Sequence, residues 1–162
     1  MRRLRADSPV KAFIVAAAAV ALDQAAKSLA LSNLSTTEPV PVIGDALRLV
    51  LKFNEGAAFS LSWGGPGVLV AMTALAAAAV TVAILRWRRR SPAGTTGLGL
   101  ILGGALGNLG DRIFRDGRVI DFLDMGIGAR RWPTFNVADI AITCGALMLV
   151  ILHRDGGKGE NA

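Results

Sequence analysis

The chain has one cysteine, one histidine and no tyrosine among its 162 residues, and only 19% of its residues are charged. The single cysteine, Cys144, excludes an internal disulfide framework and a cysteine-based zinc cluster. The single histidine, His153, excludes HExxH-type metal sites, because those sites need two histidines. Soluble domains usually carry about 25% charged residues, so the low charge argues against an ordinary cytosolic enzyme.

Hydrophobic residues make up 52% of the chain, and they gather in four long stretches. A helix needs about 20 mostly apolar residues to cross a bilayer, so these stretches predict a polytopic membrane protein. We expect one transmembrane domain over residues 1–152, followed by a disordered cytoplasmic tail at 153–162. The predicted spans are residues 12–31, 67–85, 93–110 and 137–152, and the predicted outer loops are 32–66 and 111–136.

The first apolar stretch also has features of a secretory signal peptide. A basic start, Met1–Arg5, precedes it, and Ala19-Val20-Ala21 resembles a cleavage site. The apolar pattern resumes after Lys27, which favours a retained transmembrane helix. Asp23 and Lys27 are four residues apart and therefore share one helix face, where they can neutralise each other inside the membrane.

Basic residues predict the orientation of the chain. Ten of them lie in the N-terminus, the Arg86–Arg90 loop and the tail, whereas the two longer outer loops together hold seven. The positive-inside rule therefore places both termini in the cytoplasm. The formal net charge of +6 does not indicate nucleic-acid binding, because the basic residues lie between long apolar runs.

Short strand patterns occur in the two outer loops. Residues Leu47–Phe53 alternate in the manner of a half-buried strand, and Arg118–Phe122 has a similar composition. A turn at 126–128 precedes a third predicted strand at 130–135. We expect these strands to form a small extracytoplasmic sheet that rests on the outer membrane face. In the third span, Gly99, Gly103 and Gly107 form a small-residue stripe that favours close helix packing.

Four aspartates, Asp111, Asp121, Asp124 and Asp139, lie near the outer ends of the third and fourth spans. We place Asp124 in a solvated loop and give Asp111, at a helix end beside Arg112, a structural role. Asp121 lies between two apolar residues, a setting that would raise its pKa, and Asp139 opens the fourth span. Two carboxylates that share a proton can activate a water and protonate a carbonyl, which is aspartic-peptidase chemistry. Spacing alone leaves the choice of pair open.

Other catalytic schemes have less support. A Ser–His triad would need a histidine on the outer side, whereas His153 lies on the cytoplasmic side. A Ser–Lys dyad could pair Lys27 with Ser60 or Ser62, whereas Ser28 is adjacent to Lys27 and is expected to point elsewhere. Cys144 lies in the middle of a span, where packing is its expected role.

Five separated blocks resemble one known family, the bacterial lipoprotein signal peptidases, also called signal peptidase II. Any one block would be a weak signal, but five in the same order and spacing are specific. The blocks are residues 23–27 (DQAAK), 54–59 (NEGAAF), 103–112 (GGALGNLGDR), 119–122 (VIDF) and 135–139 (FNVAD).

The resemblance implies four transmembrane helices with a small extracytoplasmic sheet. It also implies a metal-free and cofactor-free aspartyl endopeptidase that cuts prolipoproteins just before a lipid-modified cysteine. The family's catalytic pair falls on Asp121 and Asp139, and the first-helix motif residues Asp23 and Lys27 match a structural position. The positions that hold substrate or support the dyad are Asn54, Gly56, Asn108, Asp111, Arg112 and Asn136.

The expected partners are diacylglyceryl-modified prolipoproteins and membrane lipids, with the cyclic peptide globomycin as inhibitor. We expect a monomer in the bacterial cytoplasmic (inner) membrane, with its active site at the extracytoplasmic face. The main alternative is a proton-coupled membrane carrier, since intramembrane carboxylates also form proton relays. A presenilin-like protease would need a Gly-x-Gly-Asp motif, which the chain lacks, and a structural membrane subunit would leave the five blocks unexplained.

Overall fold

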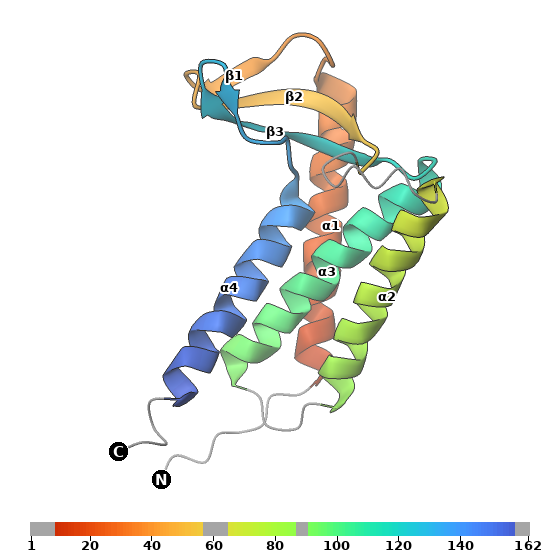
Figure 1. Ribbon diagram of the computed structural model, residues 1–162, viewed down its shortest axis with the longest axis vertical. Coiled ribbons are helices and arrows are strands. Elements are labelled where there is room, and N and C mark those ends of the chain that lie inside the picture. Colours follow the sequence, from red (N-terminus) through yellow and green to blue (C-terminus); the bar gives the residue numbers. More distant parts are fainter. Residues whose placement is uncertain (1–8, 57–64, 87–90, 158–162) are drawn as a thin grey trace.

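The computed structural model describes residues 9–56, 65–86 and 91–157 (Figure 1). Within these ranges the chain forms a helical bundle with a sheet across one of its ends. The elements follow in the order α1 (Pro9–Asn33), β1 (Val40–Ile43), β2 (Leu47–Asn54), α2 (Gly65–Arg86), α3 (Pro92–Phe114), β3 (Val119–Ile127), β4 (Arg130–Arg131) and α4 (Val137–Gly157).

Helix α3 is central, because it packs against α1, α2 and α4. Its glycines allow this close approach. A Cβ atom on Gly103 would lie 2.6 Å from the carbonyl oxygen of Ala16 in α1, and one on Gly97 would lie 3.0 Å from that of Gly145 in α4. The predicted packing role of the glycine stripe is therefore confirmed, with α1 as the neighbouring helix.

All four helices extend beyond the apolar stretches that predicted them, and in two of them the extension changes a predicted neighbouring segment. Helix α3 runs to Phe114, so Asp111 and Arg112 lie in its last turns and not in the outer loop predicted to begin at residue 111. Helix α4 runs to Gly157, so residues 153–157 are helical and not disordered, while residues 158–162 lie outside the described residues. Backbone hydrogen bonding continues past the last apolar residue until a stop such as Gly156-Gly157, and hydropathy alone does not detect that point.

By length and apolar composition, two helices in the described ranges can cross a membrane, Pro9–Asn33 and Gly67–Arg86. The apolar part of α4, Val137–Leu152, is shorter. Helix α3 carries seven glycines and ends in polar residues, which lowers its hydropathy. The count of four spanning helices thus stays a prediction.

The sheet is antiparallel, with strand order β1-β2-β3-β4. The prediction of a strand at 47–53 is confirmed by β2, whereas β3 is longer than the predicted segment 118–122 and includes two residues of the predicted turn at 126–128. Strand β4 has only two residues, because the chain leaves the sheet at Trp132 apart from a single bridge between Leu123 and Phe135. Strand β1 was not predicted, since Pro41 interrupts its pattern.

The sheet lies at the end of the bundle where α1 ends and α4 begins, and the start of α1 and the end of α4 lie at the opposite end (Figure 1). This arrangement brings β2 and β3 next to the last turns of α3 and the first turn of α4. Those four elements carry the candidate site.

Candidate active site

The start of α4 is built as a reciprocal helix cap. The side-chain oxygen of Asn136 accepts a hydrogen bond from the backbone N–H of Asp139 at 3.0 Å, and the Asp139 carboxylate accepts one from the backbone N–H of Asn136 at 3.2 Å. This is a capping box with an aspartate in the third helical position, where the helix dipole also favours a negative charge. The local sequence Asn-Val-Ala-Asp therefore fixes the position of Asp139.

Asp121 lies on β3, and its carboxylate is held by two amides. Asn136 donates to Oδ1 of Asp121 at 2.7 Å, and Asn54, at the end of β2, donates to Oδ2 at 2.9 Å. The other amide atom of Asn54, Oδ1, accepts from the backbone N–H of Gly56 at 2.8 Å. Gly56 has a φ of +82°, a conformation that suits glycine, so this turn fixes the Asn54 amide next to Asp121.

Asn108 and Asn136 connect the two carboxylates. Asn108 donates to Oδ1 of Asp139 at 3.0 Å, and its own carbonyl oxygen accepts from Asn136 at 3.2 Å. Asn136 is fully buried and also donates to the backbone carbonyl of Ile120 at 3.2 Å. The site is thus a pair of hydrogen-bonded amides, Asn108 on α3 and Asn136 at the N-cap of α4, with one carboxylate at each end.

Asp121 is 1% exposed, and this burial raises its pKa to about 6. The hydrogen bond from Asn54 works in the opposite direction, because it stabilises the ionised carboxylate, while the nearby charge of Asp139 raises the pKa further. Asp121 can therefore hold a proton under mildly acidic conditions and release it near neutral pH.

A buried lysine lies beneath this site. Lys27 in α1 has no exposed surface, and its ammonium group contacts Asp23 and Asp111 at 2.8 Å each and the Asn108 amide oxygen at 2.9 Å. An ammonium group has three N–H donors, so these three acceptors satisfy all of them. The predicted pairing of Asp23 with Lys27 is confirmed. Asp111 pairs with Lys27 and not with its sequence neighbour Arg112.

These buried charges also hold the elements that carry the two site carboxylates. Asp23 accepts from the backbone N–H of Ala138 at 2.9 Å, in the first turn of α4. Asp111 accepts from the backbone N–H of Ile120 at 3.2 Å, next to Asp121 on β3. A further member, Gln24, was quoted in the first motif without a role, and it donates to Asp111 at 3.3 Å. The sequence offered one sign of this role, because a glutamine inside a long apolar stretch needs a buried hydrogen-bond partner.

Arg112 lies beside the site on α3 and is directed toward α2. Its guanidinium donates to the hydroxyl of Thr73 at 3.4 Å, and its Nε is buried without a hydrogen-bond partner among the residues that the structure describes. The guanidinium lies close enough to Asp139, Asp121 and Asp111 for an electrostatic attraction to each of these carboxylates. A buried N–H group next to two carboxylates can donate to a bound substrate.

The expectation that Asp124 lies in a solvated loop is wrong. Asp124 is 5% exposed on β3, with Arg48 at 2.7 Å and Arg131 at 2.9 Å. Burial acts to raise the pKa of this carboxyl, but the hydrogen bonds from the two arginines outweigh it and hold the pKa below its ordinary value. Asp124 therefore stays ionised within the sheet. Its hydrogen bonds within the described part of the chain come from these two arginines and not from the residues around Asp121, so we assign it a structural role.

The described residues include no group of three or more His, Cys, Asp or Glu side chains placed to hold a metal ion. The arrangement can perform acid–base chemistry through two carboxylates at the sheet end of a helical bundle. Two solved structures described as bacterial membrane enzymes share the fold. One aligns with a TM-score of 0.80 and 26% identity over 93% of this chain and 92% of the other, and the second with 0.78 and 27% over 87% and 90%. The fold is thus that of a membrane enzyme.

Sequence comparison identifies the family to which this membrane-enzyme fold belongs. Residues 15–153 match the family described as signal peptidase (SPase) II. A lipoprotein signal peptidase of Rhodococcus jostii is 45% identical over 147 residues, which are 86% of this chain and 70% of the relative. One of Chlorobium phaeobacteroides is 40% identical over 150 residues, or 87% and 94%. The chain belongs to the signal peptidase II family of aspartic-type peptidases, and the resemblance stated from its motifs is confirmed.

Proposed function

We propose that the protein is a membrane aspartyl endopeptidase that removes signal peptides from diacylglyceryl-modified prolipoproteins, cutting just before the lipidated cysteine. Family membership supports the removal of signal peptides from prolipoproteins. The observation that carries the catalytic assignment is the amide-bridged pair Asp121 and Asp139, of which Asp121 is buried with a pKa of about 6.

In this proposal the two carboxylates share one proton and divide the chemistry. Asp121, whose raised pKa retains the proton, donates it to the carbonyl oxygen of the scissile peptide bond. Asp139 accepts a proton from a water molecule, which attacks the carbonyl carbon. As the tetrahedral intermediate collapses, Asp139 gives the proton it took from water to the leaving amine, and Asp121 takes a proton back from a hydroxyl of the intermediate, so the pair returns to its starting state.

The surrounding polar groups have supporting roles. Asn54, Asn108 and Asn136 orient the carboxylates, and their amides can also bind the substrate backbone. Gly56 fixes the turn that positions Asn54. The buried Nε of Arg112 donates to a substrate carbonyl.

The buried charges of α1 and α3 are assigned a positioning role. Asp23, Lys27 and Asp111 hold the start of α4 and the first half of β3, so they act on the two catalytic carboxylates without touching substrate.

We propose that all four helices cross the bacterial cytoplasmic membrane, with both termini in the cytoplasm and the sheet outside. The uneven distribution of basic residues supports this orientation. Helices α3 and α4 fall short in apolar composition or length, but a polar face is tolerated where it packs inside a bundle. The site would then lie at the outer membrane surface. Globomycin binding, lipid contacts and a monomeric state are further expectations of this assignment.

No described contact favours the alternative of a proton-coupled carrier. A proton relay needs carboxylates at several depths that can exchange protons. Asp23 lies well inside α1 and is instead paired with the fully buried Lys27 at 2.8 Å, and Asp111 is paired with the same lysine at 2.8 Å.

The decisive experiment is cleavage of a lipidated prolipoprotein peptide by the purified protein. Asp121→Asn and Asp139→Asn should each abolish turnover while the protein remains folded, because an amide cannot exchange the shared proton. Asp116→Asn is the matched control. The Asp116 side chain is 93% exposed, and asparagine tolerates its φ of +52°. Normal turnover by either Asp121→Asn or Asp139→Asn would refute the assignment of that carboxylate.

A further inference from the structure

Helix α2 also contacts the candidate site, near its own start. It packs mainly against α3, on the side away from α4 (Figure 1). Its inner face includes Leu69, Thr73 and Ala77, which are four residues apart and therefore lie one above the other. They are less exposed than Met72 and Leu75 on the outer face, at 55% and 72%. The inner face is thus directed toward α3 and the residues at its end.

Two residues of this inner face reach separate parts of the site. Leu69 packs against the turn that fixes Asn54, because a Cβ atom on Gly56 would collide with Cδ1 of Leu69. The hydroxyl of Thr73 accepts a hydrogen bond from the Arg112 guanidinium at 3.4 Å and donates one to the Leu69 carbonyl at 2.8 Å. A hydroxyl has one donor and two acceptor lone pairs, so both bonds can form together.

The position of Arg112 is notable because three carboxylates of the site attract its guanidinium, those of Asp139, Asp121 and Asp111. Within the described part of the chain, however, its hydrogen-bond acceptor is the Thr73 hydroxyl, and its Nε is buried without a partner. This Nε–H group is free to donate to a substrate only while the guanidinium is held apart from the carboxylates.

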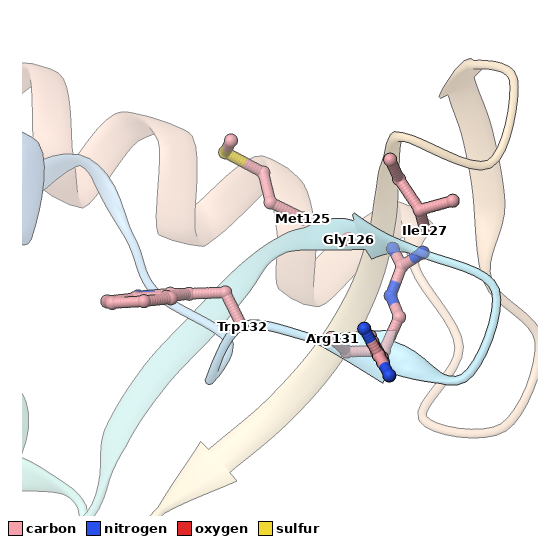
Figure 2. A pocket seen from close by; sticks show the side chains of 6 residues that line it. Met125, Gly126, Ile127, Arg131 and Trp132 are labelled. Carbon is pink, nitrogen blue, oxygen red and sulfur yellow. The ribbon is translucent and has the colours of Figure 1, made fainter.

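The sheet shows how arginines of this fold behave beside a buried carboxylate when they are free to reach it. Arg131, which lines the hollow shown in Figure 2, contacts Asp124 at 2.9 Å, and Arg48 contacts the same carboxylate at 2.7 Å. Charge-assisted pairs of this kind are among the strong hydrogen bonds of proteins. If Arg112 were released, a similar pair with a site carboxylate would occupy both the carboxylate oxygens and the N–H donors that substrate needs.

We propose that Thr73 is a positioning residue of the active site, which holds the Arg112 guanidinium toward α2 and keeps its Nε available to substrate. Thr73 acts through Arg112 and does not touch the reacting atoms. Helix α2 thereby becomes a fifth element of the site, together with β2, β3, α3 and α4. The inference deepens the proposed function, on which the role of Arg112 toward substrate rests.

Thr81 provides a matched control on the same helix, about two turns further from the sheet. Like Thr73 it is half-buried, and its hydroxyl donates to the carbonyl four residues earlier, at 2.8 Å in both cases. Within the described residues, the Thr81 hydroxyl accepts no hydrogen bond from an arginine. Valine has the shape of threonine without the hydroxyl. Thr73→Val and Thr81→Val therefore remove the same bond to the helix, and only Thr73→Val also removes the acceptor of Arg112.

The first measurement is cleavage of a lipidated prolipoprotein peptide by the protein in nanodiscs. We expect Thr73→Val to lower kcat/KM at least about fivefold, because Arg112 is no longer held. Thr73→Ser keeps the acceptor, so it should stay within about twofold of the unaltered protein, as should Thr81→Val. An unchanged rate in Thr73→Val would overturn the proposal. Equal losses in Thr73→Val and Thr81→Val, or in Thr73→Val and Thr73→Ser, would overturn it as well.

The second measurement follows Arg112 directly and needs no substrate. In protein labelled with isotopic nitrogen in arginine, NMR detects the buried Nε–H group, and Arg112→Lys identifies its signal by removing it. We expect Thr73→Val to move this signal and Thr81→Val to leave it in place. A signal that does not move in Thr73→Val would refute the proposal. If the unaltered protein failed to cleave the peptide, the proposed function would be wrong, and the signal would still decide whether Thr73 holds Arg112.

Discussion

The side chain of Asn136 ties the two proposed catalytic carboxylates to one rigid point. It donates a hydrogen bond to Asp121 and caps the helix turn that carries Asp139. The positions of the two carboxylates are therefore coupled through one side chain. For capping the helix alone, any acidic or amide side chain at the third helical position of α4 would suffice. Because this acid faces Asn108 and the Asp121 cluster, an ordinary helix cap is also part of the proposed site.

Asn54 offers a way to test the protonation of Asp121. The pKa of Asp121 is about 6, so its proton is retained below that pH and lost above it. In the proposed mechanism, kcat/KM therefore falls as pH rises through about 6. Asn54→Ala removes a hydrogen bond that stabilises the ionised form, so it raises the pKa of Asp121. We expect the falling limb of the pH–rate profile to move to higher pH.

The matched control for this profile is Asn33→Ala, at the end of α1. The Asn33 side chain is exposed, and within the described residues it donates to its own helix, at the carbonyl of Leu29. Its pH profile should match that of the unaltered protein. A uniform loss of rate in Asn54→Ala, with no shift along the pH axis, would mean that Asn54 only orients substrate or backbone.

At the scale of elements, the contact between α1 and α3 depends on glycine. Gly103→Ala would place a methyl group 2.6 Å from both the Ala16 carbonyl oxygen and the Ala19 side chain. Backbone atoms cannot move aside as a flexible side chain can, so the helices must separate. We expect a loss of about 1–3 kcal/mol of stability from overpacking, measured as a lower thermal midpoint in detergent.

Gly110→Ala on the same helix provides the comparison. Apart from the backbone of its own helix, a Cβ atom there would meet no atom of the described residues within 4 Å. Alanine has a higher helix propensity than glycine, by about 1 kcal/mol, so this variant should be neutral or more stable. Equal destabilisation by both substitutions would show that the short interhelical distance at Gly103 is not the cause of the loss, since helix propensity favours alanine at both positions.

The sequence predicts elements well where one local signal dominates. Apolar length located the four helices, and alternation located β2. Prediction from the sequence fails where the environment of a residue is set by a contact with a residue distant along the chain. Asp124 was placed in a solvated loop because its partner Arg48 lies 76 residues away. The amide bridge of the site was equally inaccessible, since it requires α3, α4, β2 and β3 to be packed together, although the motifs had already named its members.

At the scale of the whole molecule, the apolar helix surfaces and the polar candidate site occupy different parts of the fold. The helices supply an apolar surface, with Leu29, Leu75 and Leu147 between 55% and 72% exposed, that suits a lipid environment. The polar residues of the candidate site lie at the sheet end of that surface, on the last turns of α3, on β3 and in the first turn of α4. A substrate held in the bilayer by its own lipid chains would present its cleavage site at this level.

This geometry predicts a strong requirement for lipidated substrate. Each buried acyl CH₂ contributes about 0.8 kcal/mol, so two chains hold the peptide firmly in the bilayer and reduce its search to two dimensions. A soluble peptide must instead bear the full ordering cost at the site. We expect kcat/KM for an unlipidated peptide to be at least about a hundredfold lower, or roughly 2.7 kcal/mol. Matched peptides with and without the diacylglyceryl group, compared in one nanodisc preparation, provide the measurement. Equal rates would mean that lipid anchoring is no part of recognition.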